Sequence, residues 1–170
     1  MLKNLPGKRK LGVEINPYAC SVAASNGVEV VASISDIADD VADVIISNHC
    51  LEHVPNPMET LVKLRSKIKI AGSVMFVVPC ETIHDAYTPG NIDHHLYTWT
   101  PRNLGNLFYE AGYQVLYCER DKFLWPPKMI KLIARFGGRS GFDLATKTLV
   151  LHRSSDWICK SSTHFGSALV

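Results

Sequence analysis

The sequence lacks the features that mark several specialised classes of protein. No apolar run approaches the ~18 residues that a membrane span needs, and the basic start, MLKNLPGKRK, has no apolar core after it, as a signal peptide would. Lysine and arginine are scattered, with no basic stripe interleaved with aromatic residues. The composition therefore favours neither a membrane span nor a nucleic-acid partner.

Cysteine pairs and early glycines are also missing. The five cysteines are widely spaced and include no CxxC pair, which indicates neither a zinc knuckle nor a redox dithiol. Unpaired cysteines are typical of a reducing compartment, so we expect a cytoplasmic protein. The first ten residues contain a single glycine, Gly7. A length of 170 residues predicts one domain.

What is present alternates between strand and helix. LGVEI (Leu11 to Ile15) reads as a strand, Asn16 and Pro17 then start a helix, and Asn26-Gly27 ends it before a second strand over 28–32. The order strand, helix, strand predicts a parallel sheet with helices on its faces.

The next strand precedes the most polar turn of the chain. Val44-Ile45-Ile46 is an unbroken run of β-branched residues, which predicts a strand buried on both faces. It stops at Ser47-Asn48-His49, where the chain becomes polar within one residue. Because open α/β sheets bind ligands at the carboxyl ends of their strands, we expect the functional site here.

The second half continues the pattern and then changes it. Apolar residues at helical spacing predict a helix from Met58 to Ile70, followed by a buried strand over 73–78. A polar loop over 81–100 leads into a helix that starts at Thr100-Pro101. Two further strands, over 113–120 and 145–152, are expected to pair antiparallel. Between them, 126–136 reads as a basic helix, either a flap or a surface element. We expect residues 1–153 to form the domain and 154–170 to be a loose tail.

Three segments in this order resemble class I S-adenosylmethionine-dependent methyltransferases. They are DVIISNHCLEHVPNP, LVKLRSKIKIAGSVMFVVP and HHLYTWTPRNLGNLFYEAGYQV, and the similarity covers most of residues 10–120. The likeness is greatest to the branch that methylates small molecules. It implies a Rossmann-like α/β sandwich with a mostly parallel sheet and an antiparallel strand pair at its C-terminal end. It also implies S-adenosylmethionine as cofactor and a small-molecule acceptor.

The resemblance assigns roles to individual residues. In the family, an acidic residue at the position of Glu14 binds the cofactor ribose, with Ile15 beside it, and a polar residue near Asp36 contacts the adenine. Ser47 and Asn48 match the lining of the methionine end. His49 is either a general base for a hydroxyl acceptor or a cap for the following turn.

The loop over 81–100 would form the wall beside the acceptor. The resemblance assigns this role to the segment containing His94, His95 and Tyr97. Its adjacent histidines and nearby Asp93 could instead bind a metal, although a single loop of this kind is weak support. We therefore assign no metal ligand here.

A rival from another catalytic class comes from His49-Cys50-Leu51-Glu52-His53. This string fits H-x-x-E-H, a zinc-protease pattern. The pattern needs both histidines on one face of a continuing helix, whereas here Pro55 follows at once. A zinc hydrolase is thus a remote alternative.

One part of the family pattern is absent from this sequence. Members have a first strand and a GxGxG turn before the strand that corresponds to Leu11 to Ile15, and no GxGxG occurs here. The first strand-helix unit of the fold is therefore expected to be missing. Because that strand is central, its loss leaves backbone groups to be paired by another chain, by sheet closure or by water. The alternative function is a non-catalytic remnant, in the form of a homodimer that supplies the pairing.

Overall fold

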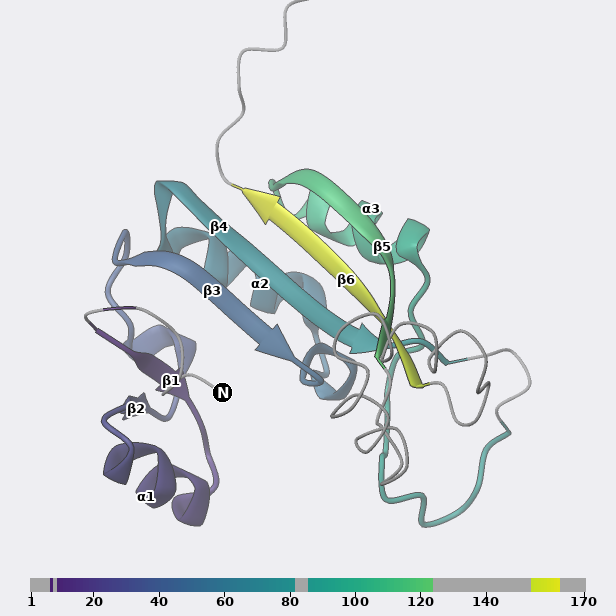
Figure 1. The fold of residues 1–170 in the computed structure, drawn as a ribbon, viewed down its shortest axis with the longest axis horizontal. Helices are drawn as coiled ribbons and strands as arrows, with labels where there is room; N and C mark the ends of the chain where they lie inside the picture. Colours follow the sequence, from purple (N-terminus) through teal and green to yellow (C-terminus); the bar gives the residue numbers. More distant parts are fainter. Residues whose placement is uncertain (1–6, 8, 82–85, 124–153, 163–170) are drawn as a thin grey trace, which may run out of the picture.

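Two β-sheets organise the chain (Figure 1). The computed structural model describes residues 7, 9–81, 86–123 and 154–162. The smaller sheet consists of β1 (Leu11–Val13) and β2 (Glu29–Val31), which are parallel. In Figure 1 this sheet, with helix α1 (Pro17–Ser25), lies beside β3 at one end of the larger sheet.

The larger sheet has the strand order β3-β4-β6-β5. β3 (Ala42–Asn48) and β4 (Ile68–Pro79) are parallel, whereas β6 (Ser154–Ser162) is antiparallel both to β4 and to β5 (Gln114–Phe123). The predicted α/β class is confirmed, and so is an antiparallel strand pair at the C-terminal end.

Side-chain caps explain where two of the helices begin. Asn16 accepts hydrogen bonds from the N–H groups of Tyr18 and Ala19, and Pro17 supplies the first helical residue of α1. Helix α3 (Pro101–Glu110) begins with a capping box in which Thr100 and Asn103 bind each other's backbone N–H groups. Both starts were predicted from the sequence.

Helix α2 (Pro57–Lys67) ends earlier than predicted. The sequence pattern continued to Ile70, but β4 begins at Ile68. The N–H groups of Asp40 and Val41 donate to the carbonyls of Ser66 and Lys67, at 3.0 Å each. These long-range hydrogen bonds occupy carbonyls of the last turn of the helix, and the chain then joins the sheet.

The core lies between the larger sheet and the helices α2 and α3, which both lie behind the sheet in Figure 1. Its aromatic centre is Phe108, whose ring packs against Phe76 of β4 at 5.1 Å and against Tyr113 at 5.5 Å, centroid to centroid. The buried hydroxyl of Tyr113 donates to the carbonyl of Leu61 in α2, at 2.9 Å. This bond ties the start of β5 to α2.

The expectation that β3 is buried on both faces is wrong. No residue of β3 is fully buried, and 56% of the surface of Val44 is exposed. The reason lies in the strand order: β3 is the end strand of its sheet, and among the described residues only β4 pairs with it. A sequence typical of an interior strand therefore occupies an edge.

The C-terminal predictions need correction as well. Residues 154–162, expected in a loose tail, form β6 in the interior of the larger sheet. The strand predicted over 145–152 and the basic helix over 126–136 lie outside the described residues. The sheet of the domain thus extends past residue 153.

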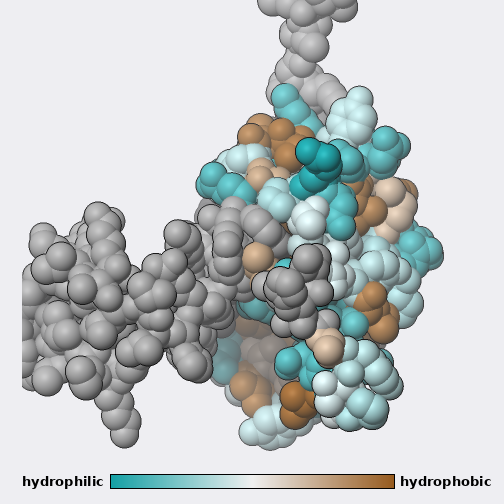
Figure 2. Space-filling model, turned by 90° about the vertical axis from the view of Figure 1, so that its right-hand side faces the viewer, coloured by the Kyte–Doolittle hydropathy of each residue, from teal (hydrophilic) through white to brown (hydrophobic). Residues whose placement is uncertain are grey.

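The surface is mixed in character on the face shown in Figure 2. Among the described residues visible there, apolar side chains form small separate groups between polar ones. Scattered exposed apolar residues of this kind are normal for a folded domain. None of the described helices is long and apolar enough to cross a membrane.

Candidate functional site

The candidate site starts where β3 ends. Ser47 and Asn48 are its last residues, and the N–H of His49 still donates to the carbonyl of Val77 in β4, at 2.9 Å. His49 has a φ of 49°, in the left-handed region that few non-glycine residues adopt. The backbone therefore turns sharply at His49 and enters the single 3-10 turn η3 (Leu51–His53).

Glu52 in this turn is completely buried. Within the described part of the chain, neither carboxylate oxygen has a hydrogen-bond partner. Two imidazoles lie close to its Oε1: His49 Nδ1 at 3.7 Å and His53 Nε2 at 3.8 Å. Among the predictions from the sequence, only the zinc-hydrolase alternative gave Glu52 a chemical role, and none gave its burial.

The loop after β4 packs on this turn. The N–H of Leu96 donates to the carbonyl of Glu52 at 2.8 Å, and the hydroxyl of Tyr97 donates to the carbonyl of Pro55 at 2.8 Å. His95 lies edge-on to His53, with ring centroids 4.9 Å apart. The structure thus places His95 and Tyr97 beside η3, whereas the side chain of His94 is exposed.

The imidazole of His95 is hydrogen-bonded to a second carboxylate, that of Glu81. Its Nδ1 lies 2.5 Å from Oε1 of Glu81, the residue that follows β4 and Cys80. The other oxygen of Glu81 accepts a hydrogen bond from the hydroxyl of Thr98 at 3.2 Å. Glu81 was not among the predicted site residues, and its pairing with His95 spans 14 residues of sequence.

Glu14 lies directly after β1. Its Oε1 accepts the N–H groups of Ile15 and Asn16, both at 2.9 Å, which fixes the carboxylate at the end of the strand. Oε2 accepts no hydrogen bond from any described residue. Ile15 is 83% exposed.

The pKa of the Cys50 thiol is affected by groups at both strand ends. Partial desolvation raises the pKa of Cys50, and the carboxylates of Glu52 and Glu14 raise it further, while a hydrogen bond with Ser47 acts in the opposite direction. Because Glu14 influences this thiol, the carboxyl ends of β1 and β3 lie on the same edge of the molecule. This is the edge at which an open α/β fold binds its ligand.

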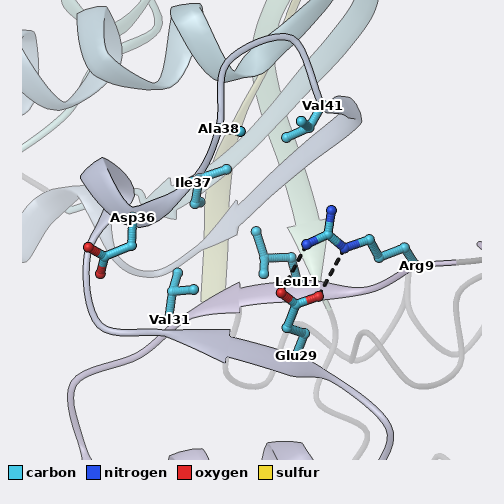
Figure 3. A pocket seen from close by; sticks show the side chains of 8 residues that line it. All are labelled: Arg9, Leu11, Glu29, Val31, Asp36, Ile37, Ala38 and Val41. Atoms are coloured by element: carbon cyan, nitrogen blue, oxygen red, sulfur yellow. Dashed lines mark hydrogen bonds and ion pairs between the residues drawn. The ribbon is translucent and has the colours of Figure 1, made fainter.

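Asp36 follows the carboxyl end of β2. It belongs to the 3-10 turn η2 (Ile34–Asp36), where its carboxylate accepts the N–H of Ser33 at 3.0 Å in a capping box. It also lines a cavity of about 160 Å³ between the small sheet and the segment that leads into β3 (Figure 3). Arg9 and Glu29 close one side of this cavity with two hydrogen bonds of 2.9 Å.

A family model described as a methyltransferase domain matches residues 7–117. The chain belongs to this methyltransferase family. The predicted kinship with class I S-adenosylmethionine-dependent methyltransferases is thereby confirmed, and S-adenosylmethionine is the cofactor that membership implies.

Solved structures show the same fold at low sequence identity. An S-adenosylmethionine-dependent methyltransferase from Methanosarcina mazei has a TM-score of 0.61 and 12% identity, with 92% of this chain and 82% of that one covered. One from Archaeoglobus fulgidus has a TM-score of 0.56 and 17% identity, over 89% and 75%. The [4+2]-cyclase SpnF has a TM-score of 0.60 and 11% identity, over 92% and 66%. No curated protein matches the sequence.

The methyltransferase cofactor fits this chain in part. Glu14 presents a carboxylate oxygen at the end of β1, as a ribose requires. The cavity beside Asp36 is small for a whole cofactor, since ligand sites usually enclose roughly 300–1,000 Å³. No GxGxG turn precedes β1 in the sequence to approach the methionine end. The contact of Glu14 with the ribose stays a prediction.

The structure does not have the helix that the zinc-hydrolase alternative requires around His49 and His53. Its H-x-x-E-H pattern requires a helix that carries both histidines on one face. Here His49 precedes the turn in a left-handed conformation, and η3 ends at His53.

Proposed function

We propose that this methyltransferase domain transfers the methyl group of S-adenosylmethionine to a small-molecule acceptor. The observation that carries the proposal is that Glu14 follows β1, that Ser47, Asn48 and His49 lie at the end of β3, and that residues of both strand ends surround the Cys50 thiol. When bound, the cofactor supplies an electrophilic methyl on a sulfonium. The chain itself must bind, align and desolvate the reactants.

Each residue has a role in this proposal. Glu14, through Oε2, accepts the ribose hydroxyls, while Ile15 and Asp36 flank the adenosine. Ser47 and Asn48 line the methionine end. His49 accepts the proton that a hydroxyl acceptor loses, and its Nδ1 lies 3.7 Å from Oε1 of Glu52.

The acceptor side is formed by the loop that packs on η3. His95 and Tyr97 form the wall, and His94 stands at its rim. The small size of the acceptor is tested by incubating the protein and a cell extract with methyl-labelled cofactor. We expect label in the low-molecular-mass fraction, and label in protein or RNA would contradict the assignment.

Cofactor binding is tested by a thermal melt with S-adenosylhomocysteine. At about 100 times its dissociation constant, a ligand that binds only the folded state adds about 2.7 kcal/mol of stability, or several degrees in melting temperature. We expect this shift in the wild type and in the control Glu110→Ala, whose exposed carboxylate ends α3, and no shift in Glu14→Ala. A cooperatively folding wild type without a shift would exclude cofactor binding by this chain.

A second candidate function is that of a non-catalytic module that assembles as a homodimer. The observation in its favour is the division of the sheet: within the described residues, β1 pairs only with β2, and β3 only with β4. Unpaired strand edges favour strand addition from another chain. Light scattering over a range of concentrations, in the cytoplasmic salt and reducing conditions that we expect for this protein, distinguishes a dimer from a cofactor-binding monomer.

A further inference from the structure

Three side chains meet where η3 contacts the loop after β4. Glu52, His53 and His95 each offer one ligand atom, and these atoms all lie within 4.8 Å of one another. Glu52 and His53 are neighbours in η3, and His95 is brought to them by the hydrogen bond from Leu96 N–H to the Glu52 carbonyl. The cluster thus combines two segments that lie far apart in the sequence.

The carboxylate of Glu52 requires a positive partner. It is fully buried, and neither of its oxygens accepts a hydrogen bond within the described ranges. Burying a carboxylate without compensation costs several kcal/mol. The backbone carbonyl of Glu52 already accepts a hydrogen bond from the N–H of Leu96, so only the side-chain oxygens lack a hydrogen-bond partner among the described residues.

The third residue is prepared as a metal ligand. Nδ1 of His95 is engaged by Glu81, which leaves Nε2 as the nitrogen that can bind a cation. Histidine ligands commonly pass their other N–H to a carboxylate, which fixes the ring and increases its basicity. Thr98 binds the second oxygen of Glu81, so this outer partner is itself held in place.

We propose that Glu52, His53 and His95 bind a divalent metal ion of the zinc class, with Glu81 as the outer partner of His95. Two imidazoles and one carboxylate form a donor set that zinc accepts, and three protein ligands leave one position for water or an acceptor oxygen. Ligand atoms around tetrahedral zinc lie about 3.4 Å apart, so binding draws the three side chains together by small rotations. The site differs from the H-x-x-E-H hypothesis, because His95 of the loop replaces His49.

The metal site is tested on the full chain after removal of metals with a chelator. Zinc is titrated in competition with a chromophoric chelator, and Co²⁺ serves as a spectroscopic probe of coordination. We expect one equivalent of zinc per chain. Glu52→Gln and His95→Ala are expected to weaken binding more than tenfold, and Glu81→Gln by about 10- to 100-fold. The control His94→Ala changes the adjacent, exposed histidine and retains the affinity of the wild type.

Two results would overturn the proposal. One is a cooperatively folding wild type that binds no stoichiometric zinc. The other is equal zinc affinity in the wild type, Glu52→Gln and His95→Ala. A thermal melt without metal establishes whether each variant folds. If either Glu52→Gln or His95→Ala does not fold, the other one is used for the comparison with the wild type. Because the S-adenosylhomocysteine melt is measured separately, failure of the metal site leaves the proposed methyl transfer intact.

Discussion

Tyr113 combines a polar group with complete burial. Its hydroxyl donates to the Leu61 carbonyl, while its ring packs against Phe108. Burial raises the pKa of Tyr113 well above its usual value near 10, and the nearby Arg65 offsets this only in part. The folded protein therefore keeps this phenol protonated where the unfolded chain begins to ionise.

Tyr113→Phe tests both properties of this residue. At neutral pH the variant is expected to lose about 1 kcal/mol of unfolding free energy, the usual value of a buried hydrogen bond, as measured by urea denaturation. Above about pH 10 the unfolded wild type binds fewer protons than the folded state, so wild-type stability falls by up to ~1.4 kcal/mol per pH unit from this group.

The difference between the two proteins should therefore shrink above pH 10 and remain constant below it. Other tyrosines titrate in both proteins and cancel in the comparison. A difference that stays constant from pH 8 to pH 11 would contradict the burial of this phenol.

At the scale of the elements, two capped helices differ in what they pack against. α3 buries Leu104 and Phe108 in the core, whereas α1 has no buried residue. Thr100→Ala removes the cap of α3 and should cost about 1 kcal/mol of global unfolding free energy. Asn16→Ala removes the cap of α1 and should cause local fraying, with little change in the global transition.

Urea denaturation and amide hydrogen exchange measure these two effects. The matched control is Asn106→Ala, an exposed position within α3 that has no capping role, and it should leave stability almost unchanged. A similar global loss from both cap variants would mean that α1 is part of the cooperative core.

The elements also indicate how far sequence patterns reach. Local chemistry predicted the caps at Asn16 and Thr100, because each cap bonds within three residues. The predicted end of α2 was wrong, because it depends on long-range hydrogen bonds from the N–H groups of Asp40 and Val41 to the last turn of the helix. The burial of β3 was wrong for the same reason: the run Val44 to Ile46 suits a covered strand, but strand order determines whether a cover exists.

The candidate site follows the same division. Polar residues after β3 were predicted from the abrupt change at Ser47, which is a local pattern. The ring contact of His95 with His53 and its bond to Glu81 depend on how a loop folds back, and no spacing in the sequence encodes that. The roles of Glu14, Asp36 and His49 stay predictions that came from the family resemblance.

At the scale of the whole molecule, the β1-α1-β2 unit is expected to open separately. Val28 is the only buried apolar residue that the described part of this unit contributes, whereas β4 contributes five, namely Ile68, Val74, Phe76, Val77 and Val78. Native-state hydrogen exchange should therefore show lower opening free energies for the amides of α1 and β2 than for those of β4. Equal protection in a dilute sample would contradict this division, and protection that rises with protein concentration would indicate that a second chain covers the unit.

The place of β6 has a consequence for how the protein is made. Residues 154–162 are the last described strand in the sequence, yet they lie between β4 and β5 and pair with both. Until the ribosome has made residues 154–162, β4 and β5 have no β6 to pair with, and Cys159 is absent from the core. The nascent domain therefore completes its sheet only after residues 154–162 have been made, and until then it exposes strand edges to which a chaperone can bind.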